Sequence, residues 1–87
     1  MTIKEFQDFI LRRYGTRDRQ RGTPHTFMWF IEEVGELATA LAGDDAANKA
    51  EEFADVLAWL CTLANINGVD LTQAVTKYTA GNVQGHK

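Results

Sequence analysis

Apolar residues recur at steps of three and four along most of the chain, and no segment alternates apolar with polar residues. Such steps place side chains on one face of an α-helix, whereas a half-buried strand needs a period of two. The pattern predicts a first helix over residues 3–14, with Thr2 and Glu5 as a capping box at its start. Gly15 is expected to end this helix, and the charged, aperiodic residues 16–22 predict a loop.

A second helix is predicted from Thr23, a suitable N-cap, and Pro24, which is favoured in a first turn, to about Ala42. Its apolar stripe comprises Phe27, Phe30, Ile31, Val34, Leu37, Ala38 and Leu41. Such a stripe is typical of a helix that buries one face against the rest of its domain. We therefore expect these residues in the core.

A third helix is predicted over residues 46–67, and its apolar residues cover well over half of its circumference. A helix that is apolar on so many sides needs more than one packing partner. Gly68 should end it, and Asp70 should start a short fourth helix that reaches about Tyr78, followed by a loose tail over residues 79–87. These elements predict an all-α fold, a small antiparallel bundle of about four helices that is completed by oligomerisation as a dimer or tetramer.

Composition and charge exclude several classes of protein. The 87 residues, 45% hydrophobic and 24% charged, suit a single globular domain over residues 1–87. No apolar run reaches the ~20 residues of a membrane span and no secretory signal is visible, so no membrane partner and a cytoplasmic location are expected. Cys61 is the single cysteine, which excludes an internal disulfide and a cysteine-based zinc site. The net charge of -3 argues against nucleic acid as a partner.

Two pairs of acids carry the candidate chemistry. Glu33 and Glu36 lie three apart beside the apolar face of the second helix, and Glu52 and Asp55 repeat this spacing on the third. If the two helices pack antiparallel, as their short connection favours, the four carboxylates converge. Such a cluster must be protonated or neutralised by a cation, and all-oxygen ligands suit Mg²⁺ or Mn²⁺. The pattern predicts a divalent metal site; the alternative is that these acids decorate two solvated helix faces.

The same residues resemble the motifs of a known family. The segments Glu32-Glu33-Val34-Gly35-Glu36-Leu37 and Glu52-Phe53-Ala54-Asp55-Val56-Leu57 are similar to the Glu-Glu-x-x-Glu and Glu-x-x-Asp motifs of the MazG-like nucleoside triphosphate pyrophosphohydrolases. Further similar positions are Arg21-Gly22, Thr26, the turn over residues 68–71, and Lys77-Tyr78. The resemblance therefore extends over nearly the whole chain.

This resemblance implies a member of the all-α NTP pyrophosphatase superfamily that hydrolyses a (d)NTP between its α- and β-phosphates, giving (d)NMP and pyrophosphate. It implies that Mg²⁺ is held by Glu33, Glu36, Glu52 and Asp55, and that the protein forms dimers or dimers of dimers. Glu32 is the remaining acid of the first motif, and it can orient or deprotonate the attacking water or have an exposed structural role.

Six further residues are candidates for substrate contacts: Arg17, Arg19, Arg21, Lys77, Asn82 and Trp29. The cations can grip phosphates, since guanidinium groups match phosphate oxygens bidentately, with a solvated basic loop as the alternative. By resemblance, Asn82 corresponds to an Asn on the last helix of related enzymes, but the intervening Gly81 and the short tail depart from that pattern. Trp29 lies four residues before Glu33, and its indole can stack on a base or make a core or subunit contact.

Three hypotheses about function remain. A MazG-like pyrophosphohydrolase is favoured over phosphoribosyl-ATP pyrophosphatase by the run Glu-Val-Gly-Glu-Leu, although the latter has similar length and acid pairs. The third hypothesis is a non-catalytic helical oligomer that binds a metal or nucleotide without turnover. Pyrophosphate release from a panel of dNTPs with Mg²⁺ distinguishes an enzyme from such an oligomer.

Overall fold

A computed structural model describes residues 1–80, and within them all regular structure is helical. The elements are α1 Ile3–Arg21, α2 Thr23–Leu41, α3 Ala46–Ile66, α4 Leu71–Ala74 and α5 Thr76–Thr79. The all-α prediction is confirmed. None of these helices is both long enough and apolar enough to cross a membrane.

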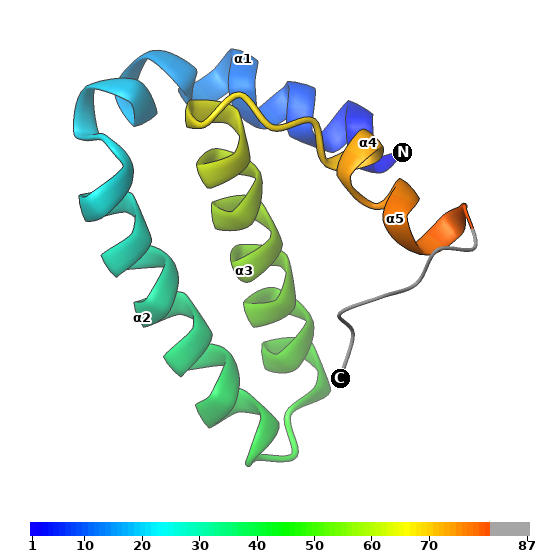
Figure 1. Cartoon of the computed structure of the whole chain (residues 1–87). Helices are drawn as coiled ribbons and strands as arrows, with labels where there is room; N and C mark the ends of the chain where they lie inside the picture. Colours follow the sequence, from blue (N-terminus) through cyan, green and yellow to red (C-terminus); the bar gives the residue numbers. More distant parts are fainter. Residues whose placement is uncertain (81–87) are drawn as a thin grey trace.

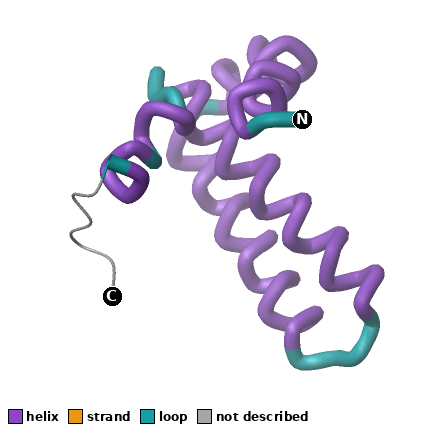
Figure 2. Tube along the Cα trace, turned by 90° about the vertical axis from the view of Figure 1, so that its right-hand side faces the viewer, coloured by secondary structure: helices purple, strands orange, loops and turns teal. Residues whose placement is uncertain are grey.

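α2 and α3 form an antiparallel helical hairpin, as predicted (Figure 1). Its loop covers residues 42–45, and Asp45 caps α3 by accepting a hydrogen bond from the backbone N–H of Asn48 at 3.1 Å. α1 lies across the end of the hairpin where α2 begins and α3 ends, and it packs chiefly against α3. The loop end of the hairpin projects away from α1, which Figure 2 shows from the side.

The prediction that the first helix ends at Gly15 is wrong, because α1 continues for six more residues through the segment expected to be a loop. Gly15 is buried within the helix, and the chain leaves α1 only at Gly22, whose φ of 84° is accessible to glycine at little strain. Tertiary contacts sustain the extra turns. Asp18 is 4% exposed and accepts a hydrogen bond from Thr62 of α3.

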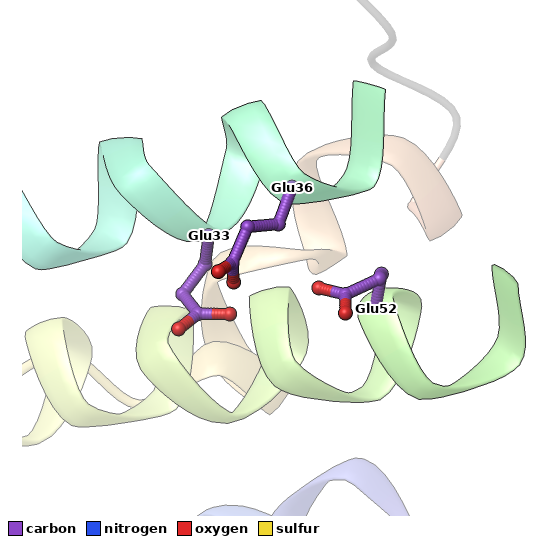
Figure 3. A group of neighbouring side chains, drawn as sticks. All are labelled: Glu33, Glu36 and Glu52. Carbon is purple, nitrogen blue, oxygen red and sulfur yellow. The ribbon is translucent and has the colours of Figure 1, made fainter. Parts of the chain in front are cut away.

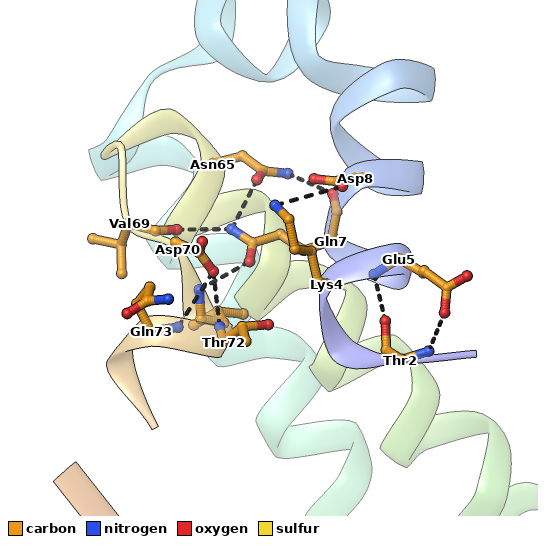
Figure 4. Close-up of polar contacts among 11 residues, drawn as sticks. Thr2, Lys4, Glu5, Gln7, Asp8, Asn65, Val69, Asp70, Thr72 and Gln73 are labelled. Atoms are coloured by element: carbon orange, nitrogen blue, oxygen red, sulfur yellow. Dashed lines mark hydrogen bonds and ion pairs between the residues drawn. The ribbon is translucent and has the colours of Figure 1, made fainter. Parts of the chain in front are cut away.

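A buried amide ties the start of α1 to the end of α3 (Figure 4). The Gln7 side-chain N–H₂ donates to the Asn65 side-chain oxygen at 3.0 Å and to the Val69 carbonyl at 2.7 Å. Its side-chain oxygen accepts from the backbone N–H of Leu71 at 2.9 Å. Gln7 therefore fixes the turn that follows α3, in which Gly68, at φ 68°, ends the helix as predicted.

The predicted fourth helix is divided into α4 and α5 at Val75. Asp70 caps α4 as expected, since its carboxylate accepts from the backbone N–H groups of Thr72 and Gln73. The Thr76 hydroxyl then donates to the Gln73 carbonyl at 2.7 Å. Side-chain bonds of this kind compete with the helical ladder, and this one spans the residue at which α4 ends.

The outer face of α2 departs from the predicted core. Phe27 is 50% exposed, and Ile31, Val34 and Leu41 are also exposed. The face that meets α3 instead includes Thr26 and Ala40, which are both buried. The predicted burial of the whole apolar stripe is therefore not found within a single chain, because α1 reaches only one end of the hairpin.

Candidate metal centre and adjoining cleft

Three carboxylates converge between the two helices of the hairpin (Figure 3). Glu33 and Glu36 project from α2 and Glu52 projects from α3, and one oxygen of each lies within 4.8 Å of the others. We call these three residues the acid cluster. The spacing of three on α2 places two acids on one strip, and the antiparallel packing brings the third opposite them.

The acid cluster is partly withdrawn from water. One carboxylate oxygen of Glu33 and one of Glu52 are buried without a hydrogen-bond partner among the described residues. Burial raises the pKa of Glu33 to about 7, and the neighbouring carboxylates of Glu36, Asp55 and Glu52 act in the same direction. Burial also raises the pKa of Glu52, with the charges of Glu36, Asp55 and Glu51 adding to the effect. Crowded, desolvated carboxylates hold their protons more tightly than isolated ones.

The unpartnered oxygens make the cluster suitable for a hard cation. A buried carboxylate without a donor is unfavourable, and a divalent ion with oxygen ligands removes both the missing contact and the mutual repulsion. Within residues 1–80 no arginine or lysine supplies this charge by an ion pair: the ion pairs there join Lys4 to Asp8 and Arg21 to Asp18. The donor set fits Mg²⁺ or Mn²⁺.

Two other acids of the motifs lie outside the group. Asp55 is exposed and its oxygens are not among the three that converge, although its charge raises the pKa of both Glu33 and Glu52. Glu32 is exposed on α2 beside Glu33. The structure thus brings together three of the four expected ligands. The fourth, Asp55, is close enough for its charge to affect the pKa of two of them.

A cleft lies on the side of the hairpin that meets α1, and one of its lining residues, Trp29, precedes Glu33 of the acid cluster by four residues. It has a volume of about 770 Å³ and lies between α1 and the hairpin, with Trp29 of α2 and Trp59 of α3 in its wall. The two indole rings meet edge to face with centroids 5.6 Å apart. Tyr14 and Arg17 of α1 line the opposite side. We call this feature the aromatic cleft.

Arg21, one of the expected phosphate ligands, is held inside the structure. Its guanidinium donates to the Asp18 carboxylate at 2.6 Å and to the Thr26 hydroxyl at 2.9 Å, and it lies over the rings of Trp29 and Trp59 at 4.8 and 5.0 Å. The Asp18 carboxylate is completed by the Thr62 hydroxyl at 3.1 Å. Removing one partner of a buried ion pair typically destabilises by about 3–5 kcal/mol. It is therefore unfavourable for Arg21 to give up its contact with Asp18 in order to bind a phosphate.

The remaining candidate contacts are dispersed. Arg17 and Arg19 are exposed on α1, and Arg17 lies over the Tyr14 ring at 5.7 Å at the edge of the aromatic cleft. Lys77 lies on α5, which packs on α4 away from the hairpin loop (Figure 1). Asn82 lies outside the described residues.

The sequence pattern does not predict the α1 side of the cleft. It predicts Tyr14 at the end of a helix and Asp18 in a loop. One local signal was present: Asp18 and Arg21 are three apart, which suits an ion pair on a continuous helix. Their burial depends on Thr62, 44 residues later in the chain, and no local pattern reveals that contact.

The fold and the acid cluster together define an all-α protein with three carboxylates gathered between two antiparallel helices. The family model of the MazG nucleotide pyrophosphohydrolase domain matches residues 22–86, which is more than half of the chain. The chain therefore belongs to this family, as the sequence motifs predicted. No curated protein matches the chain. α1 precedes the matched residues, so the aromatic cleft joins the family domain to a helix outside the match.

Proposed function

We propose that this protein is a Mg²⁺-dependent nucleotide pyrophosphohydrolase that cleaves a (d)NTP between the α- and β-phosphates, giving (d)NMP and pyrophosphate. Family membership supports a nucleotide pyrophosphohydrolase. The observation that carries the proposal is the convergence of three carboxylates with two buried, unpartnered oxygens. A triphosphate is itself strongly negative, so such a surface can bind it only through cations.

In this proposal the acid cluster, with Asp55, holds Mg²⁺, for which Mn²⁺ can substitute. A bound divalent ion lowers the pKa of water and stabilises negative charge on phosphoryl oxygens. The chain contributes a rigid frame, because three ligands stand on two long helices in direct contact. That rigidity keeps the ligand oxygens close together before the ion binds.

Glu32 is proposed to orient or deprotonate the attacking water. In the reaction a water oxygen bonds to phosphorus, the bridging P–O bond breaks, and the proton of the water passes to a base. Glu32 is exposed and adjacent to Glu33, so it is available to solvent and is not drawn into the carboxylate group. Arg17 and Arg19, exposed on α1, are proposed to contact the phosphates, as are Lys77 and Asn82.

We also propose self-association as a dimer or tetramer in the cytoplasm. Exposed apolar side chains gather on the hairpin, among them Phe27, Ile31 and Val34 of α2 and Phe53 and Leu57 of α3. Exposed apolar patches of this kind mark interaction surfaces. The net charge of -3 argues separately against nucleic acid as a partner.

The decisive test is pyrophosphate release from the common NTPs and dNTPs and from phosphoribosyl-ATP, with Mg²⁺ and with EDTA. We expect Mg²⁺-dependent release from at least one (d)NTP, and its loss in Glu33→Gln. Asp44→Asn is the matched control, because it removes one negative charge from the exposed hairpin loop. Release from phosphoribosyl-ATP alone would support the alternative pyrophosphatase. Mg²⁺ binding without release from any substrate would support the non-catalytic oligomer.

A further inference from the structure

The aromatic cleft and the acid cluster lie in series along the hairpin. Trp29 precedes Glu33 by four residues on α2, and Trp59 follows Asp55 by four on α3. Four residues of α-helix rise by about 6 Å. Because the two indoles are in contact, both steps lead in the same direction. If the phosphates of a ligand bind at the acid cluster through cations, the part of the ligand next to the phosphates therefore lies at the cleft.

In a nucleotide that adjoining portion is a sugar carrying a flat base. The cleft volume of about 770 Å³ falls within the ~300–1,000 Å³ of small-molecule sites. Its wall includes two indoles and the Tyr14 ring, and aromatic faces stack on bases of any sequence. Trp29 remains 38% exposed, so part of its surface is open to a ligand.

One guanidinium organises the aromatic wall. Arg21 lies over both indoles, and its own position is fixed by Asp18 and Thr26. Its side chain is 12% exposed and that of Asp18 is 5% exposed, so the pair is shielded from competing water. A planar cation held at both ends by hydrogen bonds restricts the two rings that it contacts.

We propose that the aromatic cleft is the nucleoside subsite and that Arg21 is a positioning residue that sets the orientation of Trp29 and Trp59. The proposal rests on the proposed function for the position of the phosphates at the acid cluster. It gives Arg21 a role different from that of the exposed Arg17 and Arg19. Arg21 acts on the nucleoside through the indoles and makes no phosphate contact.

Tryptophan fluorescence provides a direct assay, because the chain has two tryptophans and both line this cleft. The full chain is titrated in EDTA with adenosine, guanosine, cytidine, uridine and thymidine and with their monophosphates. We expect a saturable change in emission with at least one base, for the nucleoside as well as the monophosphate. EDTA separates this binding from the metal-dependent step.

Arg21→Lys tests the positioning role, because it keeps the charge and removes the planar group. We expect affinity to fall about tenfold, within the range that a lost base–aromatic stack produces, and by the same factor for nucleoside and monophosphate. A phosphate ligand would lose affinity for the monophosphate alone. Trp29→Phe keeps an aromatic ring in the wall and should also weaken both ligands, with Trp59 as the remaining reporter. Arg12→Lys, an exposed change on α1, is the matched control.

The outcomes separate the two proposals. Pyrophosphate release from NTPs without any saturable change in tryptophan emission would overturn the nucleoside subsite and leave the enzymatic function standing. Saturable nucleoside binding without pyrophosphate release would overturn the function and keep the subsite. Absence of both would overturn both. Unchanged affinity in a folded Arg21→Lys variant, or a loss confined to phosphorylated ligands, would overturn the positioning role.

Discussion

Replacement of Glu33 by Gln should stabilise the protein without metal and destabilise it with metal. The amide keeps the shape of the side chain and removes one charge from the acid cluster. In the absence of a cation, Glu33 is a partly buried carboxylate beside Glu36 and Glu52, with its pKa raised to about 7. The free energy of unfolding should therefore respond to this single charge with a sign that depends on Mg²⁺.

The magnitude follows from the pKa. A rise from 4.5 to about 7, at 1.36 kcal/mol per pKa unit, corresponds to about 3 kcal/mol against the folded state once the group is ionised. Water reaches the rest of the Glu33 side chain and screens this repulsion, so we expect about 1–2 kcal/mol. The folded state binds the proton more tightly than the unfolded state, so stability falls as pH rises from about 4.5 to about 7. The gain from Gln should be absent at pH 4 and complete at pH 8.

Mg²⁺ should reverse the sign. An ion that binds only the folded protein stabilises it by RT ln(1 + [L]/Kd), which is about 2.7 kcal/mol at one hundred times Kd. Glu33→Gln removes a ligand and most of this gain. The variant should therefore be more stable than the parent in EDTA and less stable in saturating Mg²⁺, both at pH 8.

Urea unfolding at pH 4 and pH 8, with EDTA or Mg²⁺ and at one protein concentration, measures all four free energies. Asp44→Asn serves as control, since it removes an exposed charge in the hairpin loop that is not part of the acid cluster and should change stability by less than about 0.5 kcal/mol. A Glu33→Gln variant that is indifferent to both pH and Mg²⁺ would refute the reasoning. The acids would then be ordinary solvent-exposed surface residues that bind no metal.

Three further predictions test the remaining parts of the site. Glu36→Gln and Glu52→Gln should weaken Mg²⁺ binding in calorimetry and lower turnover by orders of magnitude, whereas Glu32→Gln should lower turnover with Mg²⁺ affinity retained; full activity in all three would exclude these roles. Joint replacement of Arg17 and Arg19 by Ala should raise KM at unchanged Mg²⁺ affinity, and an unaltered KM would exclude phosphate contacts from both. Light scattering should give a dimer or tetramer, and a 9.7 kDa species at micromolar concentration would exclude self-association.

The acid cluster was predictable because its geometry is local to two helices. The two inner strips have the same spacing, three, four and three residues, in opposite chain directions. On α2 the strip is Thr26, Trp29, Glu33 and Glu36, and on α3 it is Thr62, Trp59, Asp55 and Glu52. An antiparallel pair with matching steps keeps its inner strips in register over several turns. The contact between the two indoles confirms this register. The conformation of Asp55, whose oxygens lie outside the group, depends on side-chain rotamers, which spacing does not determine.

The α1 side of the cleft was not predictable, because the residues that hold it are far apart in the chain. Arginine and glutamine are good helix formers, yet residues 16–22 have no apolar periodicity, which is the usual sign of a packed helix. In the structure this segment buries a charge instead. Asp18 is satisfied by Arg21 and Thr62, so polar contacts supply the packing that apolar residues supply elsewhere.

The two sides of α2 explain why much of its apolar stripe is exposed in the single chain. Phe27, Ile31 and Val34 each precede by two positions a residue of the inner strip, Trp29, Glu33 or Glu36. At 100° per residue two positions are 200°, so the exposed apolar residues point almost directly away from α3. The most apolar face of α2 is thus its outer face, while its inner face carries the acids. A second copy that covered the outer face would leave the acid cluster open between α2 and α3. Self-association through this face and access to the proposed metal site are therefore compatible on the same helix.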